Sequence, residues 1–277
     1  MHIHKNLKTF AKKFTEKNPR YSALLLDARG HGKSSKKIEQ SQKFQFDPPH
    51  TMKECAMDVI ETINHLNLTK SENESPIGII GHSFGARIAL QYLHTLSNPK
   101  EQQQSSISPP QQTWLLDAVP GHAHSSVENV IRAVSSIEIP ISNKKQLVHD
   151  LTEKKLIDPA IAAWMTTNLI PMKDSNGFDF SFDLDIVLCI LDQFQNQDFN
   201  QILKDIQMSR SASQSCQIHM VRALKNKSWT TDILQSFRPF MNSSQNFLKI
   251  HELNTGHWVH VDDLNGLLNV LNPSFKR

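Results

Sequence analysis

The chain has 277 residues, enough for one large α/β domain with an inserted subdomain. Its formal net charge of +3 is spread along the sequence, so it lacks the concentrated basic stripe that nucleic-acid binding needs, and we expect no nucleic-acid partner. No run approaches the roughly 20 apolar residues of a membrane span, and the first residues lack the apolar core of a signal peptide. We therefore expect a soluble protein with no transmembrane segment.

The first predicted element is an amphipathic helix near the start of the chain. Lysines surround its apolar positions, which recur at helical spacing. These positions are Leu7, Phe10, Ala11 and Phe14. We expect this apolar face to pack onto a sheet rather than onto a membrane surface.

A continuous apolar run from Tyr21 to Asp27 follows. It predicts a strand buried on both faces of a parallel sheet. The run ends in a glycine-bearing turn, in which we expect Arg29 and His31 to brace the backbone. A second helix is then predicted from Met52 to Leu66 by its apolar periodicity.

The next apolar run, Ile77 to Ile80, leads through Gly81-His82-Ser83-Phe84-Gly85 into a helical pattern that starts at Ala86. Small residues on both sides of a serine at a sharp strand-to-helix turn are typical of a nucleophile elbow. Such a turn exposes the serine hydroxyl at the positive end of a helix, whose first amides can stabilise an oxyanion. The pattern predicts acyl transfer through Ser83; the alternative is an ordinary βα turn with close packing.

Beyond this helix, residues Ser97 to Gln112 are rich in Gln, Ser, Lys and Pro and predict an exposed loop. The stretch from Thr113 to Asp117 predicts a buried strand that leaves Asp117 at its carboxyl end, where open α/β sheets place their sites. From Ser125 the pattern changes to successive helices, with a capping box at Ser125 and a helix start at Asp158-Pro159. We therefore predict a hydrolase core over residues 1–124 and 209–277, interrupted by a helical cap at 125–208.

The predicted cap contains several large apolar side chains. We weigh two roles for them, lining of an acyl pocket and packing of the cap itself, and favour packing for most. The residues are Trp164, Met165, Met172, Phe178, Phe180 and Phe182.

The core pattern resumes after the cap. It predicts strands at Gln217–Val221 and Phe247–Glu252, a helix from about Trp229, and a last helix over Leu264–Val270. Strands alternating with helices predict a doubly wound, mostly parallel sheet.

A serine nucleophile needs a histidine base, which in this fold class comes from the loop after the last strand. His257 occupies that loop, and the preceding Gly256 lets the backbone turn tightly. His260 is the competing candidate, whereas His251 lies within a strand and is expected to be structural.

The acid that orients the histidine is less obvious, because the loop after Gln217–Val221 contains no carboxylate. Asp117, which follows the preceding strand, is our choice. Asp232 is the runner-up, and Asp262 and Asp263 are expected to begin a helix.

The stretches LLLDARGHGKS, GHSFGAR, WLLDAVPG and GHWVHVD resemble the small alpha/beta hydrolase-fold esterases related to the abhydrolase-domain-containing serine hydrolases, including plant and algal members. In related bacterial esterases, the acid lies in a motif like Asp117-Ala118-Val119-Pro120, and a serine occupies the later acid loop, as Ser228 does here. The resemblance implies Ser83, Asp117 and His257 as the triad. It departs at Leu264, where a proline is common.

A larger departure lies at the start of the chain. Members of this family begin with strands and a His-Gly loop whose amide is the second oxyanion donor, and the resemblance implies that these N-terminal strands are missing here. The Phe84 amide then remains as the obvious oxyanion donor. We expect a truncated or misassigned reading frame. Any targeting peptide for an organelle would then lie in the missing segment.

Taken together, the sequence predicts a serine hydrolase that cleaves carboxylic esters. The expected substrate is a small-molecule ester, either a lipid ester or another acyl ester. The alternatives are a non-catalytic relative that acts as a binding or scaffold protein, and a change of chemistry such as acyl transfer. No organic cofactor or metal is implied; the His-x-His pairs at His2/His4 and His122/His124 lack neighbouring ligands.

The three cysteines are far apart and odd in number. They lie within apolar patterns, which predicts buried thiols in a reducing compartment and no disulfide framework. They are Cys55, Cys189 and Cys216.

Overall fold

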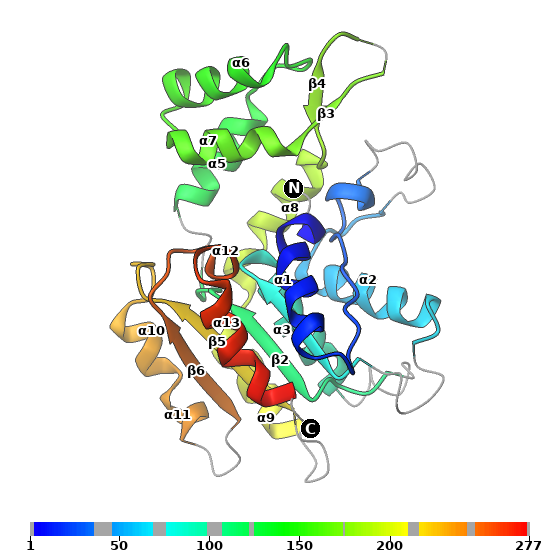
Figure 1. The fold of residues 1–277 in the computed structure, drawn as a ribbon, viewed down its shortest axis with the longest axis vertical. Helices are drawn as coiled ribbons and strands as arrows, with labels where there is room; N and C mark the ends of the chain where they lie inside the picture. Colours follow the sequence, from blue (N-terminus) through cyan, green and yellow to red (C-terminus); the bar gives the residue numbers. More distant parts are fainter. Residues whose placement is uncertain are drawn as a thin grey trace. The chain divides into compact units, whose positions relative to one another are not determined.

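The computed structural model describes residues 3–35, 46–68, 76–98, 107–121, 125–173, 175–209, 216–242 and 247–275. The chain forms two compact units, whose helices and strands are drawn in Figure 1. The sheet unit comprises Leu7–Leu25, Thr51–Gly121 and Asn196–Arg277. The helical unit comprises Met1–Asn6, Leu26–His50 and His122–Gln195.

The sheet unit is built on a four-stranded sheet in which every neighbouring pair is parallel, in the order β1-β2-β5-β6. The strands are β1 (Gly78–His82), β2 (Gln112–Leu116), β5 (Gln217–Ala223) and β6 (Leu248–Leu253). Helices alternate with these strands along the chain, so the predicted α/β class with a parallel sheet is confirmed.

Helices cover both faces of this sheet. On one face, α1 (Ile3–Lys17) and α13 (Leu264–Leu271) pack against Trp114 and Val221. On the other, α3 (Phe84–Ser97) and α9 (Phe199–Ser209) pack against Leu115 and Met220. The described residues of the unit also form α2 (Met52–His65), which packs on α3, as well as α10 (Thr231–Ser236), α11 (Arg238–Met241) and α12 (Val259–Asp262).

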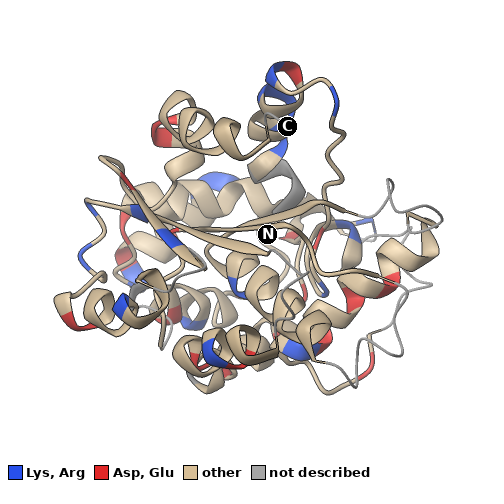
Figure 2. Cartoon of the chain, turned by 90° about the horizontal axis from the view of Figure 1, so that it is seen from below, with Lys and Arg blue, Asp and Glu red and all other residues tan. Residues whose placement is uncertain are grey.

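The predicted role of the first helix is confirmed. Phe10 and Phe14 of α1 are buried in the sheet core, and Phe14 meets Phe275 edge-on. Lys8 and Lys12 are exposed. Basic and acidic residues are spread over many of the described elements (Figure 2). No helix among the described residues has the length and apolar character needed to cross a membrane.

The strand predicted at Tyr21–Asp27 is wrong. These residues form no strand, and Leu24 is 50% exposed. Tyr21 and Leu25 still pack against the core below α1. A run of apolar residues specifies burial, but a strand also needs a neighbour for its backbone hydrogen bonds, and in the described sheet β1 pairs with β2 alone.

The helical unit has its own apolar core. Its elements are α5 (Ser125–Ser135), α6 (Lys144–His149), α7 (Pro159–Met165), α8 (Leu184–Asp192) and an antiparallel pair of strands, β3 (Leu169–Pro171) and β4 (Phe178–Phe180). The predicted start of α7 is confirmed, because the Asp158 side chain accepts hydrogen bonds from two helix amides. Three of the large apolar residues, Met165, Phe180 and Phe182, are buried in this core, which is the packing role favoured above.

The glycine-bearing turn after Asp27 also belongs to the helical unit. His31 is buried and its Nδ1 lies 2.9 Å from the carbonyl oxygen of Arg29. The Arg29 guanidinium donates to the Pro49 carbonyl at 3.2 Å. Both residues therefore brace the backbone, as predicted.

The limits of the helical unit differ from the predicted cap at 125–208. The unit ends at Gln195 and also takes in Leu26–His50. Helix α9 belongs to the sheet unit, because Phe199, Leu203 and Ile206 are buried against α3 and the sheet. Its amphipathic pattern resembles that of the preceding helices, so the sequence alone did not separate them.

The prediction of three buried thiols is corrected at one position. Cys55 and Cys216 are buried, whereas Cys189 is exposed. Cys189 lies in α8, whose sequence is apolar almost all round. Ile186 and Ile190 are buried, and Leu184 and Val187 pack against the core of the helical unit. Such a sequence does not reveal which side of the helix is covered.

A row of stacked rings crosses the sheet beneath α1 and α13. Trp114 of β2 stacks on His219 of β5 with a centroid distance of 3.9 Å, and the Nδ1 of His219 lies 2.9 Å from the Nε2 of His251. Burial, with smaller effects from His251 and Lys249, lowers the pKa of His219 to about 3. His219 therefore stays neutral in the folded protein under mildly acidic conditions.

Acidification should destabilise the protein through this histidine. Below its ordinary pKa of 6.5, His219 takes up a proton in the unfolded chain but not in the folded one. The contribution of His219 to the free energy of unfolding is therefore fully present above its ordinary pKa. This contribution falls by about 2 kcal/mol when the pH is lowered from about 7 to about 5. Burial likewise lowers the pKa of four further histidines, which are His31, His82, His251 and His260.

Urea unfolding at the two pH values tests this prediction. A His219→Phe variant keeps a ring on Trp114 but cannot titrate, so it should lose about 2 kcal/mol less than the parent between them. An equal loss of unfolding free energy in the parent and in the variant would show that His219 does not cause the sensitivity to acid.

Candidate active site

Ser83 stands at a strained turn between β1 and α3. Its backbone angles, φ 52° and ψ −112°, lie outside the regions that non-glycine residues normally occupy. The turn is held by a hydrogen bond of 2.9 Å from the Ser83 amide to the Leu116 carbonyl of β2. A strained serine at this place is the geometry that the nucleophile-elbow prediction requires.

The two flanking glycines do not contribute equally to the turn. A Cβ atom on Gly81 would overlap the backbone of Gly85. By contrast, a Cβ on Gly85 would meet nothing within 4 Å. The expectation that both glycines supply room is thus corrected: the helix start approaches Gly81, and only Gly81 is sterically required.

Asp117 and His257 are in direct contact. Asp117 follows β2, His257 follows β6, and the Asp117 Oδ2 lies 2.7 Å from the His257 Nδ1. The Asp117 side chain is fully buried, whereas that of His257 is 37% exposed. An ionised carboxylate can only accept hydrogen bonds, so Nδ1 carries the proton and the lone pair is left on Nε2. His257 therefore has the tautomer that a general base needs.

Three further groups hold the Asp117 carboxylate. The backbone amide of Ala223 and the indole N–H of Trp229 donate to Oδ1 at 3.0 and 2.7 Å. The side-chain amide of Asn226 donates to Oδ2 at 2.7 Å. Burial raises the pKa of Asp117, but the hydrogen bonds from His257, Trp229, Ala223 and Asn226 outweigh it, and the pKa falls below its ordinary value. The carboxylate is therefore ionised at neutral pH.

Sequence reasoning missed Asn226 and Trp229. It searched the loop after β5 for a carboxylate, whereas this loop supplies donors to the carboxylate of the neighbouring strand. The sequence did contain a signal for these two residues. The loop after β5 lacks a carboxylate but contains two side chains, Asn226 and Trp229, that can donate hydrogen bonds to one.

The competing candidates make other contacts than the Asp117–His257 pair. Asp232 is exposed in α10. Asp263 caps α13, as predicted, while Asp262 accepts the Gly256 amide at 2.8 Å and braces the turn before His257. His260 is buried and its Nδ1 has no hydrogen-bond partner among the described residues. His251, as expected, is a member of the stacked row in the sheet.

Arg87 of α3 ties the elbow helix to the loop that follows Asp117. Its buried guanidinium donates to the carbonyls of Val119 and Gly121 at 2.7 and 2.8 Å. Burial lowers the pKa of Arg87 to about 10, which leaves it charged at neutral pH. The same helix begins at Phe84, so the Phe84 amide lies at the positive end of its dipole.

Comparison with known proteins identifies this architecture. A family model described as alpha/beta hydrolase fold matches residues 3–102. The structure is similar to a marine microorganism esterase, with a TM-score of 0.70 and 14% identity over 98% of this chain and 90% of that one. The chain has the alpha/beta hydrolase fold. The predicted resemblance is confirmed at the level of the fold.

Two other solved structures with this fold are also similar. A hydrolase from Oleispira antarctica has a TM-score of 0.62 and 13% identity over 100% of this chain and 88% of that one. A thermophilic esterase from Thermogutta terrifontis has a TM-score of 0.57 and 15% identity over 97% of this chain and 85% of that one. A search of curated proteins found no match.

The order of the residues agrees with the alpha/beta hydrolase fold. In this fold the nucleophile, the acid and the base follow one another along the chain. Ser83, Asp117 and His257 have this order and follow β1, β2 and β6 at the carboxyl edge of one parallel sheet.

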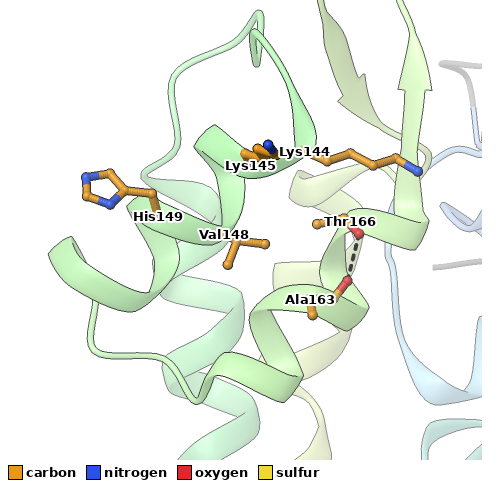
Figure 3. A pocket seen from close by; sticks show the side chains of 6 residues that line it. All are labelled: Lys144, Lys145, Val148, His149, Ala163 and Thr166. Atoms are coloured by element: carbon orange, nitrogen blue, oxygen red, sulfur yellow. Dashed lines mark hydrogen bonds between the residues drawn. The ribbon is translucent and has the colours of Figure 1, made fainter.

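A surface hollow of about 380 Å³ lies in the helical unit between α6 and α7. Figure 3 shows Val148 facing Ala163 and Thr166, with Lys144 and His149 extending away to opposite sides. The Thr166 hydroxyl donates to the Ala163 carbonyl at 2.7 Å. The hollow is therefore apolar in its centre and offers no candidate nucleophile with an adjacent base.

The described residues contain no group of three or more His, Cys, Asp or Glu side chains arranged to hold a metal ion. The two His-x-His pairs noted in the sequence lie outside the side chains that the structure describes.

Proposed function

We propose that the chain is a serine hydrolase that cleaves carboxylic esters, with Ser83 as nucleophile, His257 as general base and Asp117 as the acid that orients it. The observation that carries the proposal is the 2.7 Å contact between His257 and a buried, ionised Asp117, in a sheet whose strand β1 is followed by a serine with strained backbone angles. A carboxylate with four donors around it holds His257 in one tautomer.

The reaction follows from the tautomer. The Nε2 of His257 takes the proton of the Ser83 hydroxyl as the serine oxygen bonds to the ester carbonyl carbon. The carbonyl oxygen becomes an oxyanion, and the Phe84 amide is proposed to stabilise it. The bond to the alcohol then breaks, and His257 returns the proton to the leaving alkoxide. Water, activated by the same base, hydrolyses the acyl-enzyme and frees Ser83.

The proposed substrate is a small ester of a lipid or another acyl group. The esterases among the similar structures support this class, because the same fold carries ester hydrolysis in them. Within the class, chain length and alcohol are set by pocket side chains that no motif reveals.

A fluorophosphonate probe tests the proposal directly. It reacts covalently with serines that a neighbouring base activates, and far more slowly with ordinary serines. The parent protein should be labelled, and a Ser83→Ala variant should show no labelling, because the attacking oxygen is gone.

Two controls make the result decisive. A Ser135→Ala variant changes an exposed serine that bonds to the Arg132 carbonyl, and its labelling should equal that of the parent. Circular dichroism of each variant establishes that it is folded. A folded parent that is not labelled would overturn the proposal in favour of a non-catalytic binding or scaffold protein.

A further inference from the structure

The histidine that precedes the proposed nucleophile contacts the backbone of the proposed base. His82 is the last residue of β1, and its Nε2 lies 2.7 Å from the carbonyl oxygen of His257. The two residues are 175 positions apart in the sequence. Nothing in the motif itself indicates this bond, because the residue between glycine and serine is variable in nucleophile elbows.

The direction of the bond follows from elementary chemistry. A carbonyl oxygen only accepts, so the proton lies on His82 Nε2 and the imidazole donates it. Burial, with smaller effects from His257 and His260, lowers the pKa of His82 to about 3. His82 is thus a neutral donor at neutral pH, and the bond does not depend on a titration.

The surroundings of His82 leave it little freedom. Its ring centroid lies 4.7 Å from that of His257 and 4.7 Å from that of His260. The His257 side chain is held through Nδ1 by Asp117. Its backbone is held by His82, and the turn before it by the Gly256–Asp262 bond. Of these links, only the one from His82 starts at the residue next to Ser83.

We propose that His82 is a positioning residue, which fixes the backbone of His257 relative to the strand that carries Ser83. The inference rests on the proposed function and adds a role to it. Its physical basis is the steep dependence of proton transfer on geometry: a misplacement of about 1 Å can cost about 10²-fold in rate.

Two amide variants separate the hydrogen bond from packing. The Nε2 of glutamine stands as many bonds from Cβ as the Nε2 of histidine, so His82→Gln can still donate to the His257 carbonyl. The Nδ2 of asparagine matches only the position of Nδ1, so His82→Asn is too short to reach it. We expect the labelling rate with the fluorophosphonate probe to fall roughly 10- to 100-fold in the Asn variant and to recover in large part in the Gln variant.

A second readout does not depend on reactivity. The Nδ1 proton that His257 shares with Asp117 gives a downfield proton NMR signal, which is identified by its loss in a His257→Gln variant. We expect this signal in the parent and in His82→Gln, and its broadening by exchange with water in His82→Asn, because the His257 side chain is 37% exposed. A His260→Asn variant, which alters the other ring beside His82, should keep the signal.

The outcomes distinguish the two proposals. A parent that is folded but not labelled overturns the proposed function, and the NMR signal still decides whether His82 positions His257. A labelled parent whose Asn variant reacts equally fast and keeps the signal overturns the role of His82 alone. The role of His82 is also overturned if the labelling rate of the His82→Gln variant falls as far as that of the His82→Asn variant. The lost hydrogen bond would then not be the cause of the slower labelling.

Discussion

Replacement of Asp117 by asparagine is expected to lower kcat for hydrolysis of an activated aryl acetate by about 10⁴-fold. The amide of asparagine presents an N–H group where His257 now meets an acceptor, so the proton moves from Nδ1 to Nε2. A base protonated at Nε2 cannot take the proton of Ser83. Steady-state kinetics measure the fall, and labelling by the fluorophosphonate probe should slow in parallel.

The matched control is Asp232→Asn. Asp232 is exposed in α10 and was the alternative acid, so the same chemical change there should leave kcat at the parent value. Retention of activity in Asp117→Asn together with its loss in Asp232→Asn would place the acid in α10.

Gly81→Ala should be the most destabilising small substitution in the sheet unit. The added methyl group overlaps the backbone of Gly85, so α3 would have to move away from the end of β1. We expect a loss of about 3 kcal/mol or more in the free energy of unfolding, and a fall in Tm of roughly 6–12 °C. Thermal unfolding followed by circular dichroism measures it.

Gly85→Ala provides the comparison within the same turn. A Cβ there would meet nothing within 4 Å, and alanine favours the helix that Gly85 occupies. This variant should therefore unfold at or above the Tm of the parent. Equal destabilisation by both substitutions would show that the close approach at Gly81 is not what shapes the turn.

Much of the sheet unit was predictable because its signals are local. Each strand of the sheet contains apolar residues in a short stretch, continuous in β2 and mixed with polar residues in β5 and β6. The elbow combines a strand, a glycine pair and a helix start in one stretch. Asp117 and His257 were predictable because parallel strands bring their carboxyl ends to one edge. Their direct contact agrees with that reasoning.

The remaining features depend on contacts that a local pattern does not contain. The apolar run at Tyr21–Asp27 resembles a strand, but strand formation depends on which backbone lies beside it. The donors Asn226 and Trp229 become meaningful only once β5 is known to lie next to β2. The contact from His82 joins residues that are 175 positions apart in the sequence.

These long connections have a consequence for the order in which the protein acquires reactivity during folding. The Asp117–His257 and His82–His257 bonds close loops of 140 and 175 residues, and closing such loops is entropically costly before the core has condensed. Helices such as α2 and α3 are built from local backbone contacts and do not need these loops to close. We therefore expect a chain that has recovered most of its helix during refolding to lack an activated serine still. Covalent labelling of Ser83, the proposed nucleophile, should then report completion of the tertiary fold rather than its beginning.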